Sequence, residues 1–261
     1  MGRQVVLPEA PKRIISLVPS QTEFLYDIGL ADRIVGQTVF CVHPREKFAK
    51  AIKVGGTKKV KYDVIAGLKP DLIICNKEEN TQEIVETLSS TYPVWVSDIK
   101  TVEDACRMMV ALGEVVSGKG DQDFSARAKD IADKVRKSFS ELLPGPAHTC
   151  LYLIWKDPYM AAGKDTFIDC MLESAGFSNV LPEGSRYPEL SMNEIEALQP
   201  EYILLSSEPY PFREKHMAEL SSKLPRTKVA LVDGEFFSWY GSRLLNSRNY
   251  FKELRGSLNI A

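Results

Sequence analysis

The 261-residue sequence has no long apolar run, no excess of charge of either sign and no paired cysteine motif. No segment reaches the roughly 18–20 apolar residues that a membrane-spanning helix needs. The 33 basic and 35 acidic residues give a net charge of −2, so composition offers no basic surface of the kind that binds nucleic acid. The five cysteines include no Cys-x-x-Cys pair, which argues against a zinc ribbon and a thioredoxin-type motif.

The start of the chain, MGRQVVLPEAPKR, lacks the apolar core of roughly 7–15 residues that a secretory signal contains. Two interpretations follow from these residues alone. The protein stays in the cytoplasm, or it is exported and its signal is not part of this sequence. Val6 stands where a myristoylation motif needs Ser or Thr.

Sequence motifs of the common enzyme classes are also absent. AAGKDTF contains a Gly-Lys pair, but Pro158 and Asp165 occupy positions that a P-loop gives to Gly and to Ser or Thr. No GxGxxG, GxSxG or HExxH pattern occurs. His43, His148 and His216 are the only histidines, so we expect neither a zinc site nor any catalytic residue. His43 alone is considered as an axial ligand to haem iron or cobalt.

Strand and helix patterns alternate along most of the chain. RIISLVP, DLIICN and PVWVSD are typical of strands, and CLYLIW, YILLSS and KVALVD repeat this character later in the sequence. Because helical patterns separate these runs, the sequence predicts βαβ units and mainly parallel sheets. Ser20 is expected to cap the first helix, with Glu23 completing a capping box, and Thr101 is expected to cap a later helix.

One segment, about residues 121–143, interrupts the alternation. It contains no Gly or Pro, and its apolar residues recur every three or four positions: Phe124, Ala128, Ile131, Val135, Phe139 and Leu142. This spacing predicts one amphipathic helix of roughly six turns. We therefore expect an α/β lobe over residues 1–120, a linking helix over residues 121–144 and a second α/β lobe over residues 145–261.

Two pairs of similar segments occur in the sequence, with one member of each pair in each predicted lobe. VIAGLKPDLIICN (64–76) and EIEALQPEYILLS (194–206) share an apolar stripe, a Pro that ends a short helix, an acidic residue and a buried strand. FLYDIGLADRIV and CMLESAGFSNVL both end a helix at a glycine, Gly29 or Gly176. We interpret the repeats as two similar lobes. Ligands of parallel sheets bind outside the carboxyl ends of the strands, so the loops there are the predicted site.

The chain resembles the substrate-binding proteins of ABC importers for corrinoids, ferric siderophores and haem. Four segments carry the resemblance: PKRIISLVPSQTEFLYDIGLADRIVG, VGGTKKVKYDVIAGLKPDLIIC, DPYMAAGKDTFIDCMLESAGFSNVL and YPELSMNEIEALQPEYILLSS. SRYPELS and EFFSWYGSR are most similar to the cobalamin-binding branch. The resemblance implies two lobes joined by one rigid helix with the ligand cleft between them, opening by a small motion. It also implies a monomer outside the cytoplasm, with a permease as partner and no intrinsic cofactor.

The resemblance and the chemistry of such ligands together suggest contact residues. A corrin or haem ring calls for aromatic side chains with a few placed polar groups. The expected contacts lie in loops at strand ends: Phe40, Thr57, Lys58, Trp155, Tyr159, Tyr187, Phe236, Trp239, Tyr240 and Arg243. Thr57 and Lys58 stand where cobalamin binders carry a tryptophan, which leaves room for a siderophore or a haem propionate. Arg186 and Lys156 are further candidates to meet such an anion, and Ser20 and Gln21 to meet polar groups of the ligand.

The family docks to its permease through one acidic residue at the tip of each lobe, where pairing with arginine fixes the orientation. Asp63 matches that position in the first lobe. In the second lobe Asn193 stands at the matching position, and its neighbour Glu194 is the expected docking acid. Both acids also open a helix, where they would serve backbone N–H groups.

The sequence leaves three functions open. The first is delivery of a cobalamin-type corrinoid, a ferric siderophore or haem to an ABC importer, without enzymatic activity. The second is a cytoplasmic corrinoid or haem carrier, or an enzyme on the same scaffold. A metal-ion-binding protein of the same fold is the third.

Overall fold

The computed structural model describes residues 5, 7–44, 50–118, 123–142 and 148–260. The chain divides into two compact units. The first unit comprises Met1–Ile99, Glu103–Arg136 and Tyr240–Arg243, and the second comprises Lys100–Val102, Lys137–Trp239 and Leu244–Ala261. Each unit contains its own sheet and its own core, so each is described by itself.

The sheet of the first unit is entirely parallel. Its strands lie in the order β3-β2-β1-β4-β5 and have the bounds β1 (Ile14–Ser16), β2 (Ile34–Gln37), β3 (Ile52–Lys53), β4 (Leu72–Asn76) and β5 (Val94–Ser97). Ile15 lies opposite Ile73 in the central pair. Every residue of β1 and β4 is buried, because helices cover both faces of the sheet.

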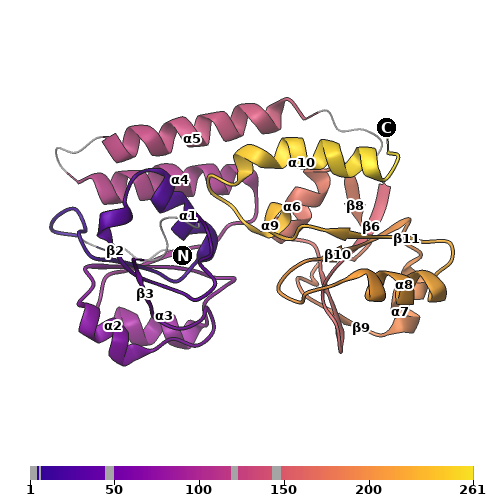
Figure 1. The fold of residues 1–261 in the computed structure, drawn as a ribbon, viewed down its shortest axis with the longest axis horizontal. Coiled ribbons are helices and arrows are strands. Elements are labelled where there is room, and N and C mark those ends of the chain that lie inside the picture. The colour runs from indigo at the N-terminus through magenta and orange to yellow at the C-terminus, as the bar shows by residue number, and fades with distance from the viewer. Residues whose placement is uncertain (1–4, 6, 45–49, 119–122, 143–147, 261) are drawn as a thin grey trace. The chain divides into compact units, whose positions relative to one another are not determined.

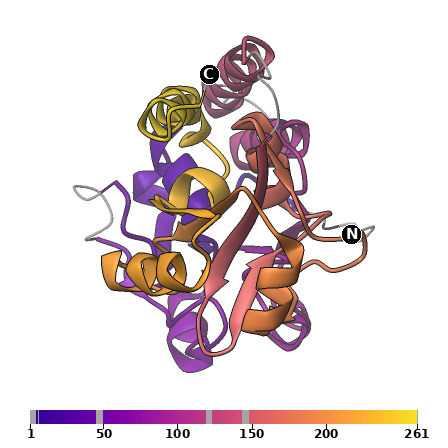
Figure 2. The same cartoon turned by 90° about the vertical axis from the view of Figure 1, so that its right-hand side faces the viewer.

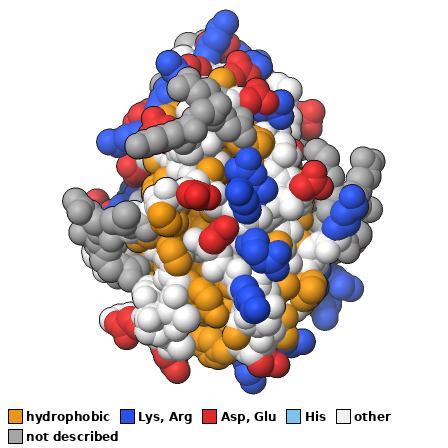
Figure 3. Space-filling model, turned by 90° about the vertical axis from the view of Figure 1, so that its left-hand side faces the viewer, with side chains coloured by type: hydrophobic (Ala, Val, Ile, Leu, Met, Phe, Trp, Pro, Cys, Tyr) orange, Lys and Arg blue, Asp and Glu red, His pale blue; other side chains and the backbone are white. Residues whose placement is uncertain are grey.

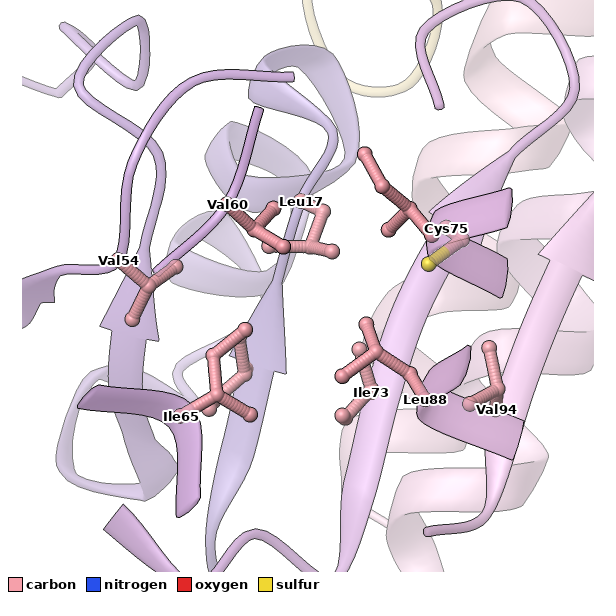
Figure 4. Close-up of a cluster of buried hydrophobic side chains, with 10 residues drawn as sticks. Leu17, Val54, Val60, Ile65, Ile73, Cys75, Leu88 and Val94 are labelled. Atoms are coloured by element: carbon pink, nitrogen blue, oxygen red, sulfur yellow. The ribbon is translucent and has the colours of Figure 1, made fainter. Parts of the chain in front are cut away.

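Helices on both sides of this sheet build the core of the first unit. They are α1 (Pro19–Asp27), the 3-10 turn η1 (Ala31–Arg33), α2 (Tyr62–Leu68), α3 (Gln82–Ser89), α4 (Val102–Ser117) and α5 (Asp123–Ser140). Figure 1 shows α2 and α3 on one face and α1 and α4 on the other. On the first face, Ile65 of α2 and Leu88 of α3 pack against Leu17, Ile73 and Cys75 (Figure 4).

The first helix begins differently from the sequence-based prediction. α1 starts at Pro19 with Val18 as its N-cap, and no side chain caps it. Proline suits the first helical position because its missing N–H would have no helical partner there. Ser20 is therefore a buried residue of the first turn, and the predicted cap at Ser20 with a capping box at Glu23 is wrong.

The sheet of the second unit is mixed. Its strands lie in the order β11-β10-β6-β7-β9, with β8 beside β6, and have the bounds β6 (His148–Trp155), β7 (Tyr159–Ala162), β8 (Phe177–Asn179), β9 (Glu189–Leu190), β10 (Tyr202–Ser206) and β11 (Lys228–Val232). β10 runs parallel to β6 and β11, whereas β7 runs antiparallel to β6 and β9. The sequence patterns did not predict β7, β8 or β9.

Helices again cover both faces of this sheet. They are α6 (Phe167–Ser174), α7 (Met192–Leu198), α8 (Glu214–Lys223), α9 (Glu235–Ser238) and α10 (Leu244–Ser257). Ile195 of α7 and Leu220 of α8 pack with Ile203 on one face. Tyr152 packs on the other, with its ring centre 5.1 Å from that of Phe237 in α9. In Figure 2 the strands of this unit lie between α10, in yellow, and the orange helices α7 and α8.

The repeated phrase forms the same element in both units. α2 leads into β4 and α7 leads into β10, and each short helix ends at a left-handed residue, Lys69 (φ 46°) or Gln199 (φ 45°). The acidic residue after the proline has a role that the sequence did not reveal. Asp71 accepts the backbone N–H of Arg13 at 2.8 Å, just before β1, and Glu201 accepts that of Thr149 at 2.7 Å in β6. Each acid thus ties one central strand to its neighbour.

The glycine of the second repeat lies beside an arginine side chain in each unit. Gly29 (φ +101°) and Gly176 (φ +85°) follow the ends of α1 and α6 in a backbone conformation that favours glycine. Arg127 of α5 donates to the carbonyl of Ile28 at 3.2 Å, and Arg255 of α10 donates to that of Ala175 at 3.4 Å. A Cβ atom on either glycine would lie 2.6 or 1.8 Å from the arginine Nη1, so the glycines also make room for these guanidinium groups.

The long amphipathic helix that the sequence predicts is present. α5 spans 18 residues, Asp123–Ser140, and buries Ala128, Ala132 and Val135. The predicted ends at residues 121–122 and 143–144 lie outside the described residues. The division between the two units falls inside α5, after Arg136. The residue boundaries proposed for the lobes and the linking helix remain predictions.

Two features of the surface follow from this architecture. Among the helices of the described ranges, none combines the length and the apolar character required to cross a bilayer. On the face drawn in Figure 3, Lys and Arg side chains form a row down the middle, with Asp, Glu and apolar side chains beside it.

Candidate ligand-binding site

The loop after β2 in the first unit displays apolar side chains to solvent. Phe40 is 56% exposed, and its neighbours Val39 and Val42 are 50% and 41% exposed. A Cβ atom on Gly56 would lie 3.2 Å from the Phe40 ring, so this loop lies directly against the loop after β3. An exposed apolar group of this kind is typical of a binding surface, and Phe40 is the expected ligand contact that the structure displays most openly.

Two other expected contacts, Thr57 and Lys58, are held by the loop after β4. The Thr57 side chain is buried, and its carbonyl accepts a hydrogen bond from Asn80 Nδ2 at 3.0 Å. Lys58 is exposed, and its Nζ donates to the carbonyl of Glu78 at 2.6 Å. The structure therefore places the lysine charge on a backbone carbonyl.

A buried polar network lies at the carboxyl ends of β1, β4 and β5. Gln21 Nε2 donates to Ser97 Oγ at 2.6 Å, and Asn76 Nδ2 donates to the hydroxyl of Tyr240. Tyr240 is 4% exposed, and burial raises the pKa of its hydroxyl far above the ordinary value. The expected ligand contacts Gln21 and Tyr240 thus lie in the interior of the first unit, whereas Phe40 faces solvent.

Arg243 is engaged with an acid in the same unit. Its Nε and Nη2 donate to the two carboxylate oxygens of Glu23 at 2.9 and 2.7 Å. The side chains of the pair are only 13% and 14% exposed. Burial raises the pKa of the Glu23 carboxyl above its ordinary value, although Arg243 acts to lower it. This bidentate pair is a strong and directional contact.

His43 lies half-buried in the loop after β2, where its positive form would lower the pKa of Glu23. In the part of the chain that the structure describes, no group of three or more His, Cys, Asp or Glu side chains is placed to hold a metal ion. A role of His43 toward a metal in a bound ligand remains a prediction.

The carboxyl end of β6 in the second unit carries an aromatic pair. Trp155 is 41% exposed, and its ring meets that of Tyr210 edge-on with the centroids 5.5 Å apart. Lys156 forms an ion pair with Glu219, and its Nζ lies 5.9 Å from the centre of the half-buried Tyr159 ring. Trp155 is therefore displayed to solvent, whereas the charge of Lys156 is engaged.

The remaining expected contacts of the second unit are packed to different degrees. Phe236 is half-buried and stacks on Tyr250 with the ring centres 4.3 Å apart. Trp239 is 7% exposed. Tyr187 is half-buried beneath the guanidinium of Arg186, which lies 5.9 Å from its ring centre. Arg186 Nε also donates to the carbonyl of Asp165 at 3.1 Å.

Glu208 is a residue of this edge that the sequence did not single out as a contact. It follows β10, and its Oε1 accepts hydrogen bonds from Ser238 Oγ and Trp239 Nε1, both at 2.8 Å. A Cβ atom on Gly234 would lie 2.8 Å from Cγ of Glu208, so the loop packs directly on the acid. Burial raises the pKa of the Glu208 carboxyl, against the effect of these hydrogen bonds. The sequence could have indicated Glu208 only as an acid two residues after a buried strand.

The two expected docking acids have different surroundings. Asp63 is exposed in the first turn of α2, next to Tyr62, which is 41% exposed. Glu194 is exposed on α7, but its carboxylate accepts hydrogen bonds from the N–H and the hydroxyl of Ser191, both at 2.7 Å. Ser191 thereby lowers the pKa of Glu194, and the two residues form a capping box. Asn193 is also exposed.

Comparison with known proteins gives a consistent result. A family model described as "Periplasmic binding protein" matches residues 14–224. The "Uncharacterized ABC transporter substrate-binding lipoprotein YvrC" of Bacillus subtilis is 27% identical over 220 residues, which cover 78% of this chain and 66% of that protein. A "Vitamin B12-binding protein" of Pectobacterium atrosepticum is 24% identical, over 90% of this chain and 85% of that protein.

Solved structures share the fold at lower identity. The vitamin B12-binding protein BtuF of Vibrio cholerae superposes with a TM-score of 0.78 at 20% identity, over 95% of this chain and 99% of that one. The haem-binding protein BhuT, solved with two haems, gives a TM-score of 0.78 at 19% identity over the same shares of the two chains. The predicted two-lobed α/β fold is confirmed by these likenesses.

Proposed function

This chain belongs to the periplasmic binding protein family, whose model matches residues 14–224, and from that premise we propose that it is the substrate-binding component of an ABC importer. The family consists of binding proteins, which confirms the expectation that the chain is not an enzyme. The name of the Bacillus subtilis relative supports the importer assignment. A permease is then the macromolecular partner, and the protein works outside the cytoplasm as a periplasmic protein or a lipoprotein.

The proposed ligand is a corrinoid of the cobalamin type. Several relatives carry the name "Vitamin B12-binding protein". The charges at the strand ends supply an independent argument, because the candidate cations are engaged within the protein. Their partners are the carbonyl of Glu78 for Lys58, the carboxylate of Glu219 for Lys156, the carbonyl of Asp165 for Arg186 and the carboxylate of Glu23 for Arg243.

These engaged cations favour a ligand with an uncharged rim. Haem propionates and acidic siderophores lose their hydration on binding and need cations or several donors in return. A corrin ring is edged with neutral amides, and its faces suit exposed aromatic side chains such as Phe40 and Trp155. The observation that carries the importer function is the family match, and the engaged cations carry the choice of ligand.

The docking residues are part of the same proposal. Asp63 stands exposed at the start of α2 and receives no hydrogen bond among the described residues, so its charge is available to an arginine of the permease. Glu194 offers an exposed carboxylate at the start of α7 while it caps its own helix. We therefore propose docking at both tips, with the contribution of Asp63 the larger.

Binding titrations test the choice of ligand. The purified protein is titrated with cyanocobalamin, haemin and a ferric hydroxamate, and binding is followed by calorimetry and by ligand absorbance. We expect cyanocobalamin to bind with a Kd below about 10 μM, which corresponds to roughly −7 kcal/mol, and the other two probes to bind far more weakly. Binding of haemin alone would refute the corrinoid, and binding of none would refute the importer function for this ligand class.

Variants of one aromatic residue locate the site. Trp155→Ala is expected to weaken cyanocobalamin binding about tenfold or more, because loss of a large aromatic contact typically costs more than about 1 kcal/mol. Trp155→Phe retains a ring and serves as the matched control, which should lie within a few-fold of the unmodified protein. Equal affinity of the Ala variant and the unmodified protein would remove Trp155 from the site.

A further inference from the structure

Glu208 combines a structural contact with an unused acceptor at the carboxyl edge of the second sheet. It lies two residues after the end of β10, in the segment that also contains Ser206 and Ser207. Ser206 Oγ donates to the carbonyl of Glu208 at 2.5 Å, and the N–H of Gly234 donates to Ser207 Oγ at 2.9 Å. The backbone of this acid is therefore fixed on both sides, and its side chain is pre-positioned.

The two carboxylate oxygens of Glu208 have different surroundings. Oε1 accepts both hydrogen bonds of the loop, from Ser238 Oγ and from Trp239 Nε1. Oε2 receives no hydrogen bond from the residues that the structure describes, and it is not among their fully enclosed polar atoms without a partner. A carboxylate has about four acceptor positions, so one side of this group is open to a donor from outside.

The charged groups near Glu208 bear on which group of a ligand could donate a hydrogen bond to it. They are Asp233, which follows β11, and Glu235, the first residue of α9, and both are acidic. The hydroxyls of Tyr152 and Tyr250 lie on the adjoining elements, β6 and α10. An anionic group of a ligand would be repelled here, whereas an N–H or O–H donor would satisfy the open oxygen.

We propose that Glu208 is a ligand-binding residue whose Oε2 accepts a hydrogen bond from a neutral donor, a primary amide, at the rim of the ligand. This inference rests on the proposed function and adds to it a residue that selects amide-bearing rims against acidic ones. At the same time Oε1 holds Ser238 and Trp239 at the end of α9. One carboxylate would thus both position this segment and discriminate between neutral and anionic groups of the ligand.

The test compares cyanocobalamin with its singly hydrolysed monocarboxylic acids, in which one rim amide has become a carboxylate. The unmodified protein should bind at least one of these acids about tenfold or more weakly than cyanocobalamin. Glu208→Gln keeps an oxygen for Ser238 and Trp239 but replaces the open acceptor by an N–H group. We expect this variant to bind cyanocobalamin about tenfold or more weakly, as for loss of a hydrogen bond to a charged group, and to lose the discrimination against that acid.

Ser238→Ala is the matched control, because it removes one donor to Oε1 and leaves Oε2 unchanged. It should remain within about threefold of the unmodified protein for all probes. A second readout needs no variant. The affinity of the unmodified protein for cyanocobalamin should decrease as the pH is lowered and Glu208, which lies near the acidic side chains of Asp233 and Glu235, becomes protonated.

The outcomes separate this inference from the function on which it rests. If the unmodified protein binds none of the corrinoids, the proposed function and this inference both fail. If it binds cyanocobalamin and the monocarboxylic acids equally well, or if Glu208→Gln leaves both affinity and discrimination unchanged, the corrinoid function stands and Glu208 serves only to position its loop.

Discussion

Replacement of Arg243 by Met tests whether this residue is structural or displayed to a ligand. In the structure Arg243 and Glu23 form a bidentate pair whose side chains are 13% and 14% exposed. Arg243→Met leaves the Glu23 carboxylate buried without its cation. Removal of one partner from a buried pair typically costs about 3–5 kcal/mol, and the slight exposure of this pair places the expected loss of unfolding free energy near 3 kcal/mol at pH 8.

The pH dependence of this loss follows from Glu23. Burial already raises the pKa of Glu23 in the folded protein, so the native state holds a proton that the unfolded state releases, and stability falls as the pH rises between the two pKa values. Loss of Arg243 raises the native pKa further. The destabilisation of Arg243→Met should therefore be smaller at pH 5 than at pH 8, because protonation removes the buried charge.

Urea unfolding of the first unit measures this effect. Trp95 is the only tryptophan of the first unit, so its fluorescence reports that unit when Trp155 and Trp239 are replaced by Phe. The double variant Glu23→Gln with Arg243→Met should recover most of the lost stability. An equal loss at pH 5 and pH 8, with no recovery in the double variant, would show that the pair is not the cause and would return Arg243 to the expected ligand contacts.

Three further predictions concern single residues. Gly29→Ala should lower the free energy of unfolding, measured by denaturation, by about 2 kcal/mol or more, because φ is +101° and Arg127 occupies the space that a Cβ atom would need. Gly256 lies in open space on α10. Gly256→Ala should therefore raise the free energy of unfolding by about 0.5–1 kcal/mol in the same assay. Asp71→Asn should lower it by about 1 kcal/mol by weakening two bonds to backbone N–H groups; unchanged stability would contradict this. In reconstituted transport, Asp63→Ala should reduce uptake more than Glu194→Gln, which retains a capping residue; the reverse order would place the main docking contact on the second lobe.

The fold was largely predictable because its signals are local. The segments around Pro70 and Pro200 predict a helix, a break and a buried strand within a few residues, and the structure confirms each of these elements. Ser20 was misplaced as a cap because the capping pattern competes with the preference of proline for the first helical position, and here Pro19 prevailed. The short strands β7 and β9 have too few residues to show a period.

The site was less predictable because its contacts join distant parts of the chain. Arg243 and Glu23 are separated by 220 positions, and Glu208 meets Trp239 across 31 positions. No spacing rule reveals such pairs. The sequence identified aromatic residues at strand ends, but it could not distinguish the exposed Phe40 and Trp155 from the buried Trp239, since exposure depends on what the rest of the fold places above each ring.

The membership of Tyr240–Arg243 in the first unit, between stretches that belong to the second, has a consequence for dissecting the protein. A fragment that ends before residue 240 would lack three side chains of the first unit. They are Tyr240, whose hydroxyl accepts a hydrogen bond from Asn76, Ser242, whose hydroxyl donates one to Asp27, and Arg243, which pairs with Glu23. Expressed alone, such a fragment should be less stable than the whole chain, and a peptide carrying residues 240–243 should restore its stability only in part. The short segment Tyr240–Arg243 thus completes a structure that residues more than a hundred positions earlier begin.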